Sequence, residues 1–371
     1  MALEKLVISC GGTGGHFYPG LSVARCFISQ GKEVLLLLSG AHAVEQQKIA
    51  ERSGVNALAL PEMPHYRKNP FRFVKGFSGG YFAAKKELKN FGAQALLGMG
   101  SFATLPVVLA AVRNHVPLFL HDGNARIGKA NRLFSRWAKL LGSAFPAVNA
   151  SSCRCKVLET GMPLRPELLA FAGMNKAAAV EAVNEIFGTD FSGEQPLILV
   201  TGGSQGAAVF NKVLPEVFCG LKKDFQVIHL TGKGKMDDTA GRYEKADFPY
   251  LLQETTGNMA EVLAASDLVF SRSGGSTAAE LALFGKPAVL IPYPFAAEGH
   301  QLDNARHFAD NGGAELVENP EFTVEKAAVL LKSFLEEPEK WQQMGETMRR
   351  LGKPDAAGVL LQEISAALDF S

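Results

Sequence analysis

Several features that define large classes of proteins are scarce or absent in this chain. Its 371 residues include five cysteines. So few cysteines, and an odd number of them, do not form a disulfide framework, which indicates a reducing compartment. Cys153-x-Cys155 has no second ligand pair at zinc-site spacing. The N-terminus has no basic segment followed by an apolar core, so no signal peptide is expected. The longest uncharged stretch, residues 91–112, is interrupted by glycines and a proline, which favours a buried strand, a turn and a helix over a membrane span.

Three signatures of nucleotide chemistry are also missing. From Gly12 onward, Phe17 stands where the third glycine of G-x-G-x-x-G would be, and the next apolar strand ends at Leu38 and Ser39 without an acid, which disfavours NAD. The Gly-Lys at 232–233 is followed by Gly234, so there is no Walker loop. No Asp-x-Asp pair is present to hold a divalent metal. We therefore expect neither a metal nor a cofactor, and a leaving group stabilised by dipoles and cations.

What the chain does contain is one pattern in both halves. A short apolar run at 5–9, glycines at 11–15 and a helical pattern at 19–30 recur as 197–201, 202–206 and about 207–221. Further apolar strands are predicted at 34–38, 117–120, 226–230, 268–271 and 288–291. The length suits about two domains. We predict an α/β fold with two doubly wound, Rossmann-like parallel-sheet domains facing a central cleft.

The charge is divided unequally along the chain. Residues 1–160 hold 20 lysines and arginines against 8 acids, whereas the rest holds 18 against 29. Two windows, 63–86 and 123–158, contain no acid at all. The first mixes cations with aromatics, which predicts a segment lying on an anionic membrane. A nucleic-acid surface and a solvated basic helix with its aromatics in the core are the alternatives. The membrane-facing residues we expect are Arg67, Lys68, Phe71, Arg72, Phe73, Lys75 and Phe77.

Polar residues at strand ends suggest where chemistry occurs. Glycine turns that open helices bind phosphates, because unpaired N–H groups and the helix dipole face the anion. The segment 271–280 brings Arg272 to such a turn and Glu280 one turn into the helix, although Thr277 and Glu280 also fit a capping box. His16 follows the first glycine turn and could act as a base, or it could be a capping or packed histidine. Asp122 follows another apolar strand.

These segments together resemble the MurG family of GT-B glycosyltransferases over nearly the whole chain. The matching motifs, in family order, are Gly11-Gly-Thr-Gly-Gly-His16-x-x-Pro19-Gly20, Gly98-x-Gly100, His121-Asp-Gly-Asn124, Gly161-x-Pro163-x-Arg165, Gly202-Gly-Ser-Gln-Gly-Ala207, Arg272-Ser-Gly274 with Glu280, and His300-Gln301-x-x-Asn304-Ala305. Two pairs depart from the family, which usually has Glu-Gln at residues 122–123 and His-Gln at residues 229–230.

The resemblance implies roles for the matching positions. An acceptor-binding, membrane-facing domain is expected at 1–162, with a C-terminal helix at 355–371 packing back on it, and a UDP-GlcNAc-binding domain at 163–354. His16 and Asp122 are the implied catalytic residues, in N-terminal loops that receive the acceptor together with Asn124. The implied donor-binding residues are Thr13, Gly14, Gly15, Asn124, Arg165, Ser204, Gln205, Arg272, Ser273, Glu280, Gln301 and Asn304.

The activity implied by the resemblance is transfer of N-acetylglucosamine from UDP-GlcNAc to lipid I, undecaprenyl-pyrophosphoryl-MurNAc-pentapeptide, with inversion. It needs no metal or nucleic acid, and it places the protein on the cytoplasmic face of the bacterial inner membrane. Three other functions remain open: a UDP-sugar transferase acting on diacylglycerol, a UDP-GlcNAc 2-epimerase, and a regulator that binds the nucleotide sugar without turnover.

Overall fold

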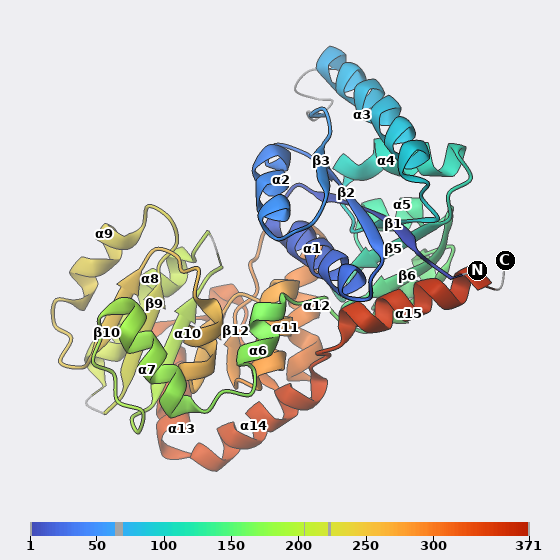
Figure 1. Ribbon diagram of the computed structural model, residues 1–371. Helices are drawn as coiled ribbons and strands as arrows, with labels where there is room; N and C mark the ends of the chain where they lie inside the picture. The colour runs from blue at the N-terminus through green and yellow to red at the C-terminus, as the bar shows by residue number, and fades with distance from the viewer. Residues whose placement is uncertain (1, 64–69, 204, 222–223, 370–371) are drawn as a thin grey trace. The chain divides into compact units, whose positions relative to one another are not determined.

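The chain forms two compact units. The structure is a computed structural model that describes residues 2–63, 70–203, 205–221 and 224–369. Unit 1 comprises Met1–Arg165 together with Pro354–Ser371, and unit 2 comprises Pro166–Lys353 (Figure 1). The last segment of the chain therefore belongs to the same unit as the first.

Unit 1 is built on a seven-stranded parallel sheet. Its strand order is β3-β2-β1-β4-β5-β6-β7, and neighbouring strands pair in parallel, as Lys5 opposite Glu33 and Gly11 opposite Ser39 illustrate. The strands are β1 (Lys5–Gly11), β2 (Glu33–Ser39), β3 (Ala57–Ala59), β4 (Ala95–Gly98), β5 (Leu118–Asp122), β6 (Ala138–Ser143) and β7 (Lys156–Glu159).

Helices cover both faces of this sheet, which explains why consecutive residues in the middle of its central strands are apolar and buried. Leu6 and Ile8 of β1 lie in one hydrophobic cluster with Phe17, whereas Val7 lies in another with Val107. The C-terminal helix α15 packs against α1 and β6 (Figure 1). The helices are α1 (Gly14–Ser29), α2 (Ala43–Arg52), α3 (Pro70–Phe91), α4 (Leu105–Arg113), α5 (Lys129–Phe134) and α15 (Ala356–Asp369), with 3-10 turns at Phe102–Thr104 and Ala150–Ser152.

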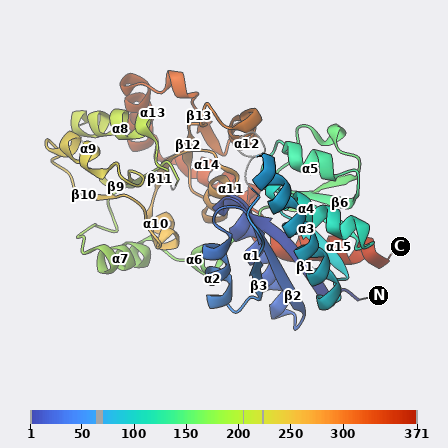
Figure 2. The ribbon, with the colours of Figure 1, turned by 90° about the horizontal axis from the view of Figure 1, so that it is seen from above.

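Unit 2 repeats this architecture with a six-stranded parallel sheet (Figure 2). Its order is β10-β9-β8-β11-β12-β13, from β8 (Leu197–Thr201), β9 (Gln226–Leu230), β10 (Tyr250–Gln253), β11 (Leu268–Ser271), β12 (Ala288–Leu290) and β13 (Ala314–Leu316). The helices are α6 (Pro166–Phe171), α7 (Lys176–Phe187), α8 (Ala208–Gly220), α9 (Met236–Ala240), α10 (Met259–Ala265), α11 (Gly275–Phe284), α12 (His300–Ala309), α13 (Val324–Glu336) and α14 (Pro338–Leu351). Three 3-10 turns lie at Gly241–Tyr243, Ala297–Gly299 and Asn319–Glu321.

The predicted fold class is confirmed, with two doubly wound parallel sheets. Several strand bounds differ from the prediction by one or two residues, and the start of the first helix was wrong: it begins at Gly14, five residues before the predicted start at Pro19. A run of glycines reads as a loop because glycine is a poor helix former. The helix nevertheless starts within the run and carries Pro19 in its second turn, where the Gly15 carbonyl has no N–H from residue 19 to accept.

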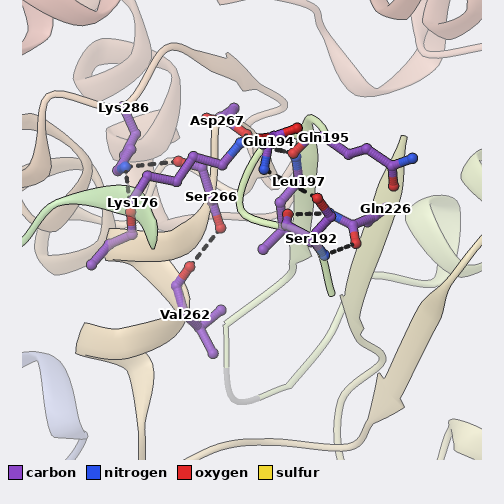
Figure 3. A network of polar contacts seen from close by, with 11 residues as sticks. Lys176, Ser192, Glu194, Gln195, Leu197, Gln226, Val262, Ser266, Asp267 and Lys286 are labelled. Atoms are coloured by element: carbon purple, nitrogen blue, oxygen red, sulfur yellow. Dashed lines mark hydrogen bonds and ion pairs between the residues drawn. The ribbon is translucent and has the colours of Figure 1, made fainter. Parts of the chain in front are cut away.

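A polar network holds the amino-terminal end of the second sheet (Figure 3). Lys176 Nζ lies 2.7 Å from Asp267 Oδ2, which also accepts the Leu197 N–H at 2.8 Å. Lys286 Nζ donates to the carbonyls of Ala264 and Ser266, and burial lowers its pKa to about 8. Because binding sites of parallel sheets lie at the carboxyl ends of the strands, this network is structural.

Within residues 2–63, 70–203, 205–221 and 224–369, no helix combines the length and the apolar character that crossing a bilayer requires.

Candidate functional site

Three loops of unit 1 meet at one edge of its sheet. They follow β1, β4 and β5, which are adjacent in the sheet and parallel. Their carboxyl ends therefore lie side by side. The loops are residues 12–13, 99–101 and 123–128. The residues predicted to receive the acceptor, His16, Asp122 and Asn124, lie in these loops or within a few residues of them.

His16 lies in the first turn of α1, over the loop that follows β4. Its Nδ1 is 3.2 Å from Thr13 Oγ1, and the ring is half-buried. A Cβ on Gly100 would lie 3.3 Å from His16 Cδ2 and 3.3 Å from Asn131 Nδ2. Gly100, with a φ of 89°, therefore lets the imidazole and the Asn131 amide approach the same point. Thr13, the N-cap of α1, is exposed, as are Gly14 and Gly15, its first two residues.

The Asp122 carboxylate is surrounded by hydrogen-bond donors. Oδ1 accepts from the backbone and side-chain N–H groups of Asn124 at 3.2 and 3.4 Å, and Oδ2 accepts from Gly128 N at 2.8 Å and Asn131 Nδ2 at 3.0 Å. The side chain is buried. This geometry gives Asp122 a positioning role, because its oxygens hold the loop and the start of α5 in place. Its part in proton transfer stays a prediction. Asn131 was not among the predicted site residues, since only the fold brings it beside His16 and Asp122.

His121 is buried behind this loop. Its Nε2 lies 2.9 Å from the Gly161 carbonyl oxygen, which can only accept, so Nε2 carries the proton. Burial lowers the pKa of the imidazole, although the nearby Gly161 carbonyl and Asp122 oppose this. The hydrogen bond from a neutral His121 therefore links the end of β5 to Gly161, which lies close to the end of the segment Met1–Arg165 of unit 1.

The strands of unit 2 also end in loops at one edge of their sheet. The glycine loop 202–206 follows β8 and lies against the residues that follow β9: a Cβ on Gly206 would lie 2.0 Å from the Thr231 carbonyl oxygen. Lys235 Nζ donates to the Gln205 carbonyl at 2.6 Å, and Gln205 itself is exposed. Ser204 lies outside the described residues. The close contact of the two loops requires glycine at 206.

A buried histidine fixes the first turn of α8 behind this loop. Asn211 Nδ2 donates to the Thr231 carbonyl at 3.0 Å, so Asn211 Oδ1 faces His229 Nε2 at 3.0 Å, and that nitrogen carries the proton. His229 Nδ1 then accepts from the Tyr243 hydroxyl at 2.9 Å. Burial lowers the pKa of His229 to about 3, so the imidazole is neutral and completes the network.

This shift predicts that stability depends on pH. His229 takes up a proton below about 6.5 in the unfolded chain but only near 3 in the folded one, so its stabilising contribution is complete above 6.5 and is lost as pH falls. Between pH 7 and 5 the free energy of unfolding should fall by about 2 kcal/mol from this residue. Urea unfolding at several pH values measures how the free energy of unfolding changes with pH. This change should be smaller in the His229→Gln variant than in the wild type. Equal slopes would contradict the assignment.

Arg272 is held by backbone carbonyls of its own unit. Its Nη1 donates to the carbonyls of Ile291 and Pro292 at 2.9 and 3.0 Å and to Asn319 Oδ1 at 2.8 Å. The guanidinium also lies 5.0 Å from the ring centroid of Phe210 and 5.6 Å from that of Tyr293. The structure thus places Arg272 where it fixes the loop after β12. A contact with phosphate stays a prediction.

Replacing Arg272 by methionine should lower the free energy of unfolding by about 2–4 kcal/mol, because three oxygens lose a charged donor. Chemical denaturation measures the change. Arg242→Met, at an exposed arginine of the same unit, serves as the control. An Arg272 variant as stable as the control would show that these hydrogen bonds contribute little.

The remaining predicted donor residues of unit 2 lie around the first turns of α11 and α12. Ser273 Oγ donates to the Gln301 carbonyl at 2.7 Å, and Asn304 Nδ2 donates to the Ser273 carbonyl at 3.0 Å. Gln301 Oε1 accepts the Tyr293 N–H at 2.9 Å. The structure therefore brings these three residues together. Glu280 is half-buried in α11.

The capping-box alternative for the start of α11 is wrong. The N-cap is Gly274, with no side-chain cap, and Thr277 lies inside the helix. A capping box would need Thr277 as the N-cap. The helix starts about one turn earlier, with Gly274 as the N-cap and Gly275 as the first helical residue. The Gly274 N-cap therefore offers no side-chain acceptor to the first N–H groups of α11.

Arg165, by contrast, belongs to unit 1. Its guanidinium lies 5.4 Å from the ring centroid of Tyr18, an exposed residue of α1. The predicted donor-binding residues thus divide between the units: Thr13, Gly14, Gly15, Asn124 and Arg165 are in unit 1, and Gln205, Arg272, Ser273, Glu280, Gln301 and Asn304 are in unit 2.

The predicted membrane-facing residues lie on α3, except Arg67 and Lys68, which fall outside the described residues. Phe71 is 87 % exposed, and Arg72 and Lys75 are exposed beside it. Phe73 and Phe77 are half-buried and stack with ring centroids 6.3 Å apart. The aromatics of this helix therefore divide between solvent and the protein.

The side chains that most often bind metal ions are scattered in the part of the chain that the structure describes. No group of three or more histidines, cysteines, aspartates and glutamates in that part of the chain could hold a metal ion.

Comparison with known proteins identifies the class. The chain matches the glycosyltransferase family 28 N-terminal domain over residues 6–142 and the family 28 C-terminal domain over residues 197–360. The crystal structure of Acinetobacter baumannii MurG is 26% identical and covers 98% of this chain and 99% of its own, with a TM-score of 0.77. The UDP-GlcNAc 2-epimerase of Neisseria meningitidis, bound to UDP-GlcNAc, shares the fold at 14% identity and a TM-score of 0.73. The fold and these domains define a GT-B glycosyltransferase.

Curated relatives narrow this class. An N-acetylglucosamine transferase of Desulfitobacterium hafniense is 31% identical over 96% of this chain and 98% of its own length. One from Chlamydia trachomatis is 35% identical over 85% of each. Both are named as UDP-N-acetylglucosamine–N-acetylmuramyl-(pentapeptide) pyrophosphoryl-undecaprenol N-acetylglucosamine transferases. The chain belongs to glycosyltransferase family 28, and within it to the MurG family.

Proposed function

We propose that the protein transfers N-acetylglucosamine from UDP-GlcNAc to the 4-hydroxyl of the MurNAc unit of lipid I, and so makes lipid II for peptidoglycan. The observation that carries this proposal is the match over nearly the full length to transferases named for that donor and acceptor. The epimerase relationship is one of fold alone.

The proposed chemistry is a single displacement with inversion. The MurNAc 4-hydroxyl oxygen bonds to the anomeric carbon of GlcNAc while the bond from that carbon to the UDP oxygen breaks. The hydroxyl proton passes to His16, and the electron pair leaves with UDP. His16 is the better of the two predicted bases, because the Asp122 oxygens already accept four N–H groups. Helix N-termini and arginine stabilise the departing diphosphate, and no metal is required.

UDP release tests this function. With UDP-GlcNAc and EDTA, the protein should release UDP only when a short-chain lipid I analogue is added. A diacylglycerol acceptor that supports release in its place would indicate the alternative transferase. Epimerised UDP-sugar formed without any acceptor would indicate the isomerase, and donor binding without turnover would indicate a regulator.

We further propose that α3 holds the protein on the anionic inner membrane, at its cytoplasmic face. Phe71, Val74 and Phe82 are 87, 60 and 65 % exposed. With Lys75 and Lys85, also exposed, they occupy positions 71, 74–75, 82 and 85, which share one face of a helix. An apolar face rimmed by lysines matches a surface of acidic headgroups over acyl chains.

The double variant Phe71→Ser and Phe82→Ser should bind vesicles containing phosphatidylglycerol at least about 10-fold more weakly, because burying each phenylalanine contributes about 1.5–3 kcal/mol. Sedimentation measures binding, and added salt should weaken it further. Val329→Ser on α13, 65 % exposed, is the control. Unchanged binding of the double variant would rule out α3 as the anchor.

A further inference from the structure

The backbone of Ser101 has a conformation that side chains rarely adopt. Its φ is 73° and its ψ is 137°, outside the small left-handed helical region that non-glycine residues occasionally enter. Among the described residues, only His115 and Glu298 are other non-glycine residues with positive φ. Strain of this kind persists where the surrounding structure imposes it, and it concentrates at functional sites.

Ser101 is the side-chain N-cap of the 3-10 turn Phe102–Thr104, a position that glycine fills almost as well as serine. Ser101 Oγ accepts the Ala103 N–H at a long 3.3 Å, while its carbonyl accepts the Thr104 hydroxyl at 2.8 Å. Glycine at 101 would keep the carbonyl bond and adopt the same φ without strain. What serine adds is a hydroxyl, which accepts from the Ala103 N–H and donates to no acceptor among the described residues.

That hydroxyl lies where two loops of the site meet. Its oxygen would be 3.5 Å from a Cβ on Gly12, in the glycine loop that follows β1. A Cβ on the preceding residue, Gly100, would lie 3.3 Å from Cδ2 of the His16 imidazole. Ser101 is half-buried. Gly14 and Gly15, the first two residues of α1, directly follow this glycine loop. Their N–H groups have no intrahelical partner.

We propose that Ser101 is a specificity-determining residue for the acceptor: its hydroxyl donates a hydrogen bond to an oxygen in the sugar-pyrophosphate head of the lipid-linked substrate. This inference rests on the proposed function, in which the loops of unit 1 receive that substrate. The strained backbone holds the hydroxyl in place before the acceptor arrives, so little side-chain freedom is lost on binding.

Two substitutions separate the hydroxyl from the backbone. Ser101→Ala removes the hydroxyl and keeps the strain, whereas Ser101→Gly removes both. Each should raise the KM for a short-chain lipid I analogue, by about 3–10-fold if the bond reaches a neutral sugar or amide oxygen and by more than about 10-fold if it reaches a pyrophosphate oxygen. The KM for UDP-GlcNAc should stay within about 2-fold. Because only glycine relieves the backbone strain, only the Ser101→Gly variant should also have a higher melting temperature, by about 2–4 °C.

Ser29→Ala is the matched control. Ser29 is an exposed serine at the opposite end of α1, bonded to the Cys26 carbonyl, and its loss should change neither KM. An unchanged acceptor KM in both Ser101 variants would overturn the proposal and leave only a local turn. So would a KM raised in the alanine variant but not in the glycine variant. Wild-type turnover of the same analogue tests the proposed function separately, so the two failures are distinguishable.

Discussion

Replacing His16 by alanine is expected to lower kcat by about 10²-fold or more, because the attacking hydroxyl then loses the group that takes its proton. The expected fall in kcat comes from the missing base and not from a change in the fold. The imidazole lies at the surface of the site, over Gly100, where a Cβ would approach it to 3.3 Å. The measurement is kcat with both substrates saturating, with the KM of each recorded alongside it.

The control for this experiment is His42→Ala. His42 is an exposed histidine at the start of α2, 3.7 Å from Glu45, and its loss should leave kcat unchanged. The thermal midpoint of His16→Ala should stay close to that of the wild type. A kcat within about 3-fold of the wild-type value would remove His16 as the base.

Gly206→Ala should nearly abolish donor binding and destabilise the protein. A Cβ at this position would lie 2.0 Å from the Thr231 carbonyl oxygen and 2.7 Å from Gly232 Cα, so the two loops must separate. The free energy of unfolding should fall by about 3 kcal/mol or more, since neither backbone segment can yield at little cost. Calorimetric binding of UDP and urea unfolding measure the two effects.

Gly203→Ala isolates the part of this loss that comes from conformation. Gly203 has a φ of 71°, close to the 63° of Gly206, but nothing lies within 4 Å of its Cβ position. It should therefore lose only about 1 kcal/mol, the cost of placing alanine in a left-handed conformation. If both variants lose the same stability, the contact between the two loops is not what requires glycine at 206.

The sheets were predictable because they depend on local composition. The run at 197–201 is aliphatic up to Thr201, and the run at 226–230 has three aliphatic residues beside Gln226 and His229, as is typical of strands buried on both faces. The two runs form β8 and β9 with the predicted bounds. The start of α1 was not predictable, because its first residues are the glycines that usually end a helix. The structural context of a full parallel sheet outweighs their low propensity.

The candidate site was predictable as a set of positions but not as a set of contacts. Arg272 follows a strand and precedes a helix, which suggests a phosphate ligand. Its partners are Ile291, Pro292 and Asn319, 19 to 47 residues away, and no local pattern reveals them. The same holds for Asp122 with Gly128 and Asn131. The strained φ of Ser101 has no sequence signal, since serine is an ordinary turn residue.

The return of α15 to unit 1 determines the order in which the chain can complete its fold. Leu360, Leu361 and Ile364 of this helix belong to the same buried cluster as Leu6, Ile8 and Phe17. Unit 2 is one continuous segment, Pro166–Lys353, whereas unit 1 needs both ends of the chain. On the ribosome, where domains generally fold as units during synthesis, the segment made second can finish first. The amino-terminal sheet stays partly uncovered until the last helix emerges.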